Sequence, residues 1–101
     1  MQNLLSLLEE EASILDLGEP GAERLQENMM SAYRKIATDG PVAVLTPQEV
    51  YAVKEALTDA GELYLFGQFD VESERERAQH MAHGRRAREQ AAALGIYVRE
   101  S

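Results

Sequence analysis

Apolar residues recur at helical spacing through the first sixty residues of the chain, which predicts three amphipathic helices. We expect these helices over about residues 3–17, 21–38 and 47–60. Their inward stripes would be Leu4, Leu7, Leu8, Ala12, Ile14 and Leu15, then Leu25, Met29, Ala32, Tyr33 and Ile36, then Val50, Val53, Leu57 and Ala60.

Capping residues mark the helix ends. Thr46-Pro47-Gln48-Glu49 matches a capping box with proline at the first helical position, so the third helix has a well-defined start. Asn3 is the expected N-cap of the first helix, because its side chain can accept from a free amide of the first turn. Gly18 and Pro20 are expected to stop that helix.

A fourth helix is predicted over about residues 70–94, and its composition is different. Residues 70–101 hold six bulky apolar residues, whereas residues 1–69 hold 25. We therefore expect a long, charged helix that is only partly buried. Gly95 is expected to take the left-handed capping conformation, with Ile96 folding back onto the last turn. The expected seam is Val71, Ala78, Met81, Ala82 and Ala92.

The fold expected from these elements is a mostly α, four-helix single domain over residues 1–101. Three short apolar runs leave an α+β alternative open, because periodicity cannot distinguish a short buried strand from a helical turn. In that alternative, residues 42–45, 63–66 and 96–98 would pair in a small sheet.

Composition narrows the function classes. The formal charge is −8, and residues 1–69 carry twelve acidic and four basic residues, which disfavours a general nucleic-acid binder and can attract a basic protein partner. Absence of cysteine excludes disulfides and thiolate sites. No secretory signal is visible and no apolar run approaches the roughly 18 residues of a membrane helix, so a cytoplasmic protein without membrane contact is expected.

Two clusters are candidates for partner binding. Arg85, Arg86 and Arg88 place three guanidinium groups within four positions, where they can grip a phosphate or the carboxylates of a partner. Solvated charge on a polar helix is the simpler interpretation. Three aromatic residues stand close together and would serve either as core or as a partner-binding knob, since aromatic residues dominate interface hot spots. They are Tyr64, Phe66 and Phe69.

Metal binding and catalysis have weaker signals. Glu76, His80 and His83 stand at i, i+4 and i+7, so one helix face can present a carboxylate and two imidazoles, but no fourth zinc ligand is apparent. The run Glu9–Glu11 is interpreted as a solvated face. No serine has a nucleophile-elbow context. We therefore expect no metal or other cofactor and no enzymatic activity.

The leading hypothesis is a non-enzymatic protein-binding module that occludes a partner surface. Small size, acidity and the lack of a catalytic motif are typical of accessory proteins of phages and plasmids, such as inhibitors and anti-activators. Self-association through residues 70–94 would also cover the thin seam of the fourth helix. The alternative hypothesis is a dimeric nucleic-acid-binding regulator that uses the arginines of that helix.

Overall fold

A computed structural model describes residues 1–60 and 74–98 of the chain, and these residues form a helical fold. The helices are α1 (Gln2–Ile14), α2 (Ala22–Asp39), α3 (Pro47–Ala60) and α4 (Glu74–Ala93), with a short 3-10 helix, η1 (Gly40–Val42), between α2 and α3. The mostly α prediction is confirmed, and the bounds of the third helix agree with it.

The described residues form no strand, so the α+β alternative is wrong for residues 42–45 and 96–98; residues 63–66 lie outside the described part. Val42 is the last residue of η1, and the rest of the apolar run at residues 42–45 has irregular backbone. Val42 and Val44 are 78 % and 83 % exposed, because the connection between α2 and α3 passes over the surface without a second layer to cover these side chains.

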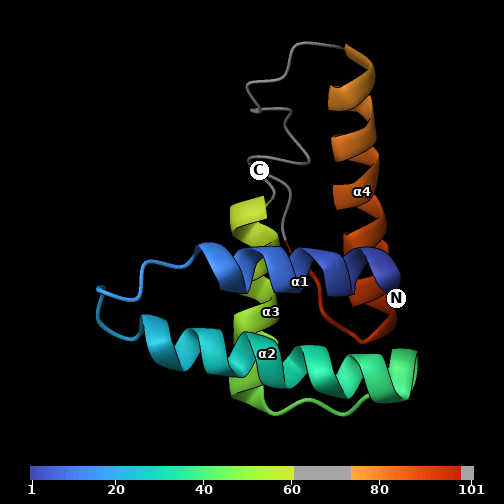
Figure 1. The fold of residues 1–101 in the computed structure, drawn as a ribbon. Helices are drawn as coiled ribbons and strands as arrows, with labels where there is room; N and C mark the ends of the chain where they lie inside the picture. Colours follow the sequence, from blue (N-terminus) through green and yellow to red (C-terminus); the bar gives the residue numbers. More distant parts are fainter. Residues whose placement is uncertain (61–73, 99–101) are drawn as a thin grey trace.

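Figure 1 shows α1 and α2 lying side by side and antiparallel, with α3 crossing behind both of them. The second half of α4 passes behind the N-terminal end of α1, and its first half extends away from the α1–α2 pair. The core lies where the helices cross, and each of the four contributes buried side chains. Its largest members are Leu4, Leu7, Leu8, Met29, Ile36, Val53 and Leu57.

The first helix differs from its prediction at both ends. It starts at Gln2 with Met1 at the N-cap position, so Asn3 is not the cap. The Asn3 side chain instead reaches α4, where its Nδ2 lies 2.9 Å from Nδ1 of His83. The helix ends at Ile14, before Gly18, because Leu15 turns to extended backbone. Ile14, the last residue of α1, is 61 % exposed, so its predicted place in the inward stripe is wrong.

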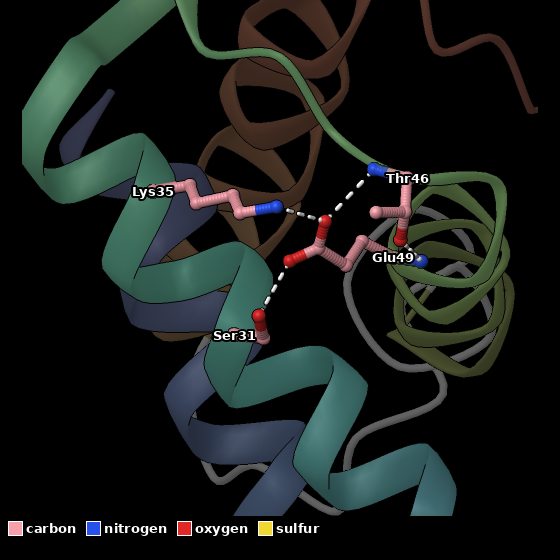
Figure 2. A network of polar contacts seen from close by, with 4 residues as sticks. All are labelled: Ser31, Lys35, Thr46 and Glu49. Atoms are coloured by element: carbon pink, nitrogen blue, oxygen red, sulfur yellow. Dashed lines mark hydrogen bonds and ion pairs between the residues drawn. The ribbon is translucent and has the colours of Figure 1, made fainter.

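The capping box at the start of α3 is confirmed and is larger than predicted (Figure 2). The Thr46 N–H donates to Oε1 of Glu49 over 2.8 Å, and the Glu49 N–H donates to Oγ1 of Thr46 over 3.2 Å. Two residues of α2 join them: Nζ of Lys35 donates to Oε1 over 2.6 Å and the Ser31 hydroxyl donates to Oε2 over 2.5 Å. A local cap thus also fixes α2 against α3.

The second half of α4 packs through small residues, but on a different face from the predicted seam. Its buried residues are Gly84, Ala87 and Ala91, whereas Ala78 and Ala82 are exposed. The missing side-chain bulk at the buried positions lets α4 approach α1 closely. The sequence prediction followed Met81, which is only half-buried, and so selected the wrong stripe.

The end of α4 forms the expected Schellman motif. Gly95 has φ +81°, a conformation that glycine adopts without a Cβ penalty. The Gly95 N–H donates to the Ala92 carbonyl over 2.9 Å, and the Ile96 N–H donates to the Ala91 carbonyl over 3.0 Å. The predicted fold back at Ile96 brings its side chain into the core.

A polar junction completes the contact between α1 and α4. The Gln90 side chain accepts from the Leu4 N–H over 2.8 Å and donates to Oδ1 of Asn3 over 3.2 Å. Gln90 thus supplies the acceptor that a capping side chain of α1 itself would otherwise provide for a first-turn amide.

Candidate functional site

Arg85 and Arg86 are exposed on the outer face of α4. Helical periodicity places Ala82 and Glu89 between them on the side opposite the buried Ala87. The structure gives neither arginine a hydrogen bond or ion pair with another described residue, including the i+4 partner Glu89. As far as the described residues are concerned, both guanidinium groups therefore keep their donors for an external group. We call this exposed face of α4 the arginine face; it comprises Ala82, Arg85, Arg86 and Glu89.

Arg88 is separated from the other two arginines. It is half-buried and lines a cleft of about 240 Å³ with Leu57, Ile96 and Tyr97, between α3 and the C-terminal end of α4. The expected group of three arginines is therefore a pair on one face and a third residue turned toward the body. The expected aromatic knob (Tyr64, Phe66 and Phe69) lies outside the described residues.

The surroundings of the two histidines of α4 differ from those of metal-binding histidines. His83 is half-buried, and its Nδ1 accepts from the Asn3 amide, so the neutral ring carries its proton on Nε2. Burial lowers the pKa of His83 and His80 lowers it further, against a raising effect of Glu10. Within residues 1–60 and 74–98, no three acidic, histidine or cysteine side chains are grouped to hold a metal ion, so Glu76, His80 and His83 are not brought together as one.

Glu11 contradicts the interpretation of Glu9–Glu11 as a solvated run. Glu9 and Glu10 are exposed, but Glu11 faces inward from α1 and is 2 % exposed. Burial, together with the negative charges of Asp59 and Glu10, raises its pKa from 4.5 to about 7. Three successive helical residues span about 200°, more than half a turn, so the three members of such a run point in different directions and Glu11 lies on the buried side.

Glu49 has the opposite electrostatics. Burial by itself raises the pKa of Glu49, but hydrogen bonds from Lys35, Ser31 and Thr46 outweigh it and lower the pKa to about 2. A carboxylate of such low basicity does not activate the Ser31 hydroxyl that donates to it. The geometry in Figure 2 is accordingly that of a structural cap.

A groove between the first turns of α2 and α3 was missed by the sequence analysis. Two adjoining clefts, of about 340 and 330 Å³, share Gly21, Leu25 and Tyr51 in their walls. We call the pair the Tyr51 groove. The larger cleft has a mainly apolar lining. Its other lining residues are Arg24, Asn28, Pro47 and Gln48, and those of the smaller cleft are Leu15, Asp16, Glu19, Pro20 and Ala22.

One signal for this groove was present in the sequence. Tyr51 is next to Val50 but off the stripe formed by Val53 and Leu57, and an aromatic residue outside the inward stripe of an amphipathic helix faces solvent. It is 59 % exposed. The clefts themselves depend on how the α1–α2 turn folds back beside α3, which no local pattern specifies.

Comparisons with protein-family models, with curated proteins and with solved structures returned no match to this chain. Among the helices in the described part of the chain, none has the length and apolar character needed to cross a membrane.

Proposed function

We propose that the chain is a non-enzymatic protein-binding module that acts by occluding the surface of a partner, in the manner of an inhibitor or anti-activator. The observation that carries the proposal is the arginine face, where Arg85 and Arg86 are exposed and make no hydrogen bond or ion pair with another described residue. An arginine pair exposed on one face of a helix fits the carboxylates of a protein surface.

The position of these arginines on α4 supports the proposal. Gly84 and Ala87, their immediate neighbours in the sequence, are buried against the body of the protein. A helix anchored by one face presents side chains of the opposite face without a loop having to become ordered on binding. Less conformational entropy is then lost on association, so a small surface contributes more affinity. The exposed Ala82 leaves room for close approach of the partner backbone.

The decisive experiment reverses the charge of this pair. Wild type, Arg85→Glu/Arg86→Glu and a matched control, Arg34→Glu/Lys54→Glu, carry the same tag and are immobilised in equal amounts. Arg34 and Lys54 are exposed on α2 and α3, so both double variants change the net charge equally. Nuclease-treated lysate from cells that express the chain is passed over each, and retained proteins are quantified by mass spectrometry.

We expect one protein to be retained by wild type and by the control variant, and to be reduced about tenfold or more on the Arg85→Glu/Arg86→Glu variant, as for loss of a hot spot. Circular dichroism and urea unfolding should show equal stability for the three proteins. Equal retention by both double variants would contradict the proposed surface. Retention that is seen only with a parallel lysate left without nuclease treatment would favour the nucleic-acid-binding alternative.

A further inference from the structure

We propose that the Tyr51 groove binds an amphipathic helix of a partner protein, with two large apolar side chains on successive turns filling its two clefts and basic residues over Asp16 and Glu19. This site is separate from the arginine face and goes beyond the function proposed for it. The turn between α1 and α2 lies at the opposite side of the molecule from α4 in Figure 1, so both surfaces can be occupied at once.

The shape of the groove indicates a side-chain binding site. Each cleft is near the lower end of the range of about 300–1,000 Å³ for ligand pockets, and the shared wall of Leu25 and Tyr51 makes them neighbours. Two adjacent pockets that share an apolar wall match the anchors of a helix, which recur at i and i+3 or i+4. Tyr51, 59 % exposed and common to both, is the aromatic residue expected to dominate the binding energy.

The walls of the groove favour a helix over an extended peptide. They are formed by α2, by α3 and by the turn at residues 15–21, and the exposed face of a helix has no row of open backbone groups like the edge of a sheet. An extended peptide would gain no ladder of main-chain hydrogen bonds there. A helix satisfies its own backbone groups and needs only side-chain pockets.

Charge selects the chemistry and the direction of the occupant. Asp16 and Glu19 are exposed at the smaller cleft. They belong to residues 1–69, which contain twelve acidic and only four basic residues. A lysine or arginine beside the apolar anchor therefore has its complement at this end. Arg24 lines the larger cleft, with the amides of Asn28 and Gln48, and favours a carboxylate or amide at the other end of the helix.

The test selects ligands without assuming a sequence. A displayed library of random peptides of about 16 residues, roughly four helical turns, is selected on the full chain and counter-selected on Tyr51→Ala. Enriched peptides are synthesised and their affinities measured by fluorescence anisotropy. The matched control is Tyr97→Ala, because Tyr97 is also an exposed tyrosine, 73 % exposed, but lies at the C-terminal end. Amide chemical-shift changes in the labelled protein locate the bound peptide.

We expect enriched peptides with two large apolar residues one turn apart and a lysine or arginine beside one of them. Their affinity should fall about tenfold or more with Tyr51→Ala and remain unchanged with Tyr97→Ala. Glu19→Lys should weaken binding severalfold, whereas the same charge change at the exposed Glu9 should not. Binding should persist in Arg85→Glu/Arg86→Glu, which separates this proposal from the preceding one.

Three results would overturn the proposal. Selection that yields no binder, or only acidic or non-amphipathic peptides, would exclude a basic amphipathic helix as the occupant. Equal binding to Tyr51→Ala and wild type would place the site elsewhere. Chemical-shift changes at Leu25 and Gln48 that grow with protein concentration in the absence of peptide would identify a second copy of the chain as the occupant.

Discussion

Replacing Glu49 by glutamine should destabilise the protein substantially at neutral pH. The glutamine has nearly the same shape but lacks the charge that three donors share: Lys35 Nζ, the Ser31 hydroxyl and the Thr46 N–H. Glutamine also brings an NH₂ group, which is itself a donor, so one of these donors would lose its acceptor.

The magnitude follows from the pKa of Glu49. Its fall from 4.5 to about 2 corresponds to roughly 3 kcal/mol of preferential stabilisation of the ionised form in the folded protein. Lys35 is 40 % exposed, so solvent screening limits the ion pair to about 1 kcal/mol or less. Most of the effect must then come from the buried hydrogen bonds to Ser31 and Thr46, each worth about 1.5–3 kcal/mol before the offset of desolvation. We expect Glu49→Gln to cost about 2–3 kcal/mol.

The pH dependence of stability provides a second check on the role of the Glu49 charge. A carboxyl group with a lowered pKa contributes stability that is fully present above its unfolded value of 4.5 and is lost as the pH falls toward about 2. Urea unfolding followed by far-UV circular dichroism should therefore show a large difference between wild type and Glu49→Gln at neutral pH. The two stabilities should converge as the pH falls through this window.

The control variant is Lys35→Met, which removes the exposed partner and leaves the buried bonds; we expect a loss of about 1 kcal/mol or less. A Glu49→Gln loss below about 1 kcal/mol at neutral pH would contradict a stabilising role for the buried charge. A difference that stays constant down to the pKa of about 2 would also refute it, because the cause would then be shape rather than charge.

Two further predictions concern other helices. The raised pKa of Glu11 makes wild type lose stability as the pH rises from 4.5 through about 7, by up to about 3 kcal/mol. Urea unfolding should show a much flatter profile for Glu11→Gln, and parallel profiles would contradict the burial of this charge. Gly95→Ala should lower the stability by about 1 kcal/mol, because alanine is strained at φ +81° although its Cβ would meet no atom within 4 Å. Thermal unfolding measures this loss, and an unchanged midpoint would argue against the left-handed cap.

The sequence by itself determined the elements whose signals are local. Thr46-Pro47-Gln48-Glu49 places the start of α3 because a capping box needs only residues one turn apart. Gly95 places the end of α4 for the same reason. The inward stripes of α2 and α3 also agree with their prediction at Met29, Ile36 and Leu57, because helical periodicity fixes which residues share a face.

The tertiary structure decided which faces meet and what they enclose. An alanine-rich helix has several nearly equivalent small stripes, so only packing against α1 selects Gly84, Ala87 and Ala91 over Ala78 and Ala82. Packing likewise turns Glu11 into the core and directs Asn3 to His83 and Gln90, some eighty residues away.

The proposed sites divide along the same line. Exposure of Arg85 and Arg86 follows from the face that α4 buries, and that face was not predictable from its composition. The Tyr51 groove exists because α2, α3 and the turn at residues 15–21 converge. Local propensity and capping depend on neighbours in the sequence, whereas clefts and interfaces depend on the crossing of helices, which is fixed by side-chain packing in three dimensions.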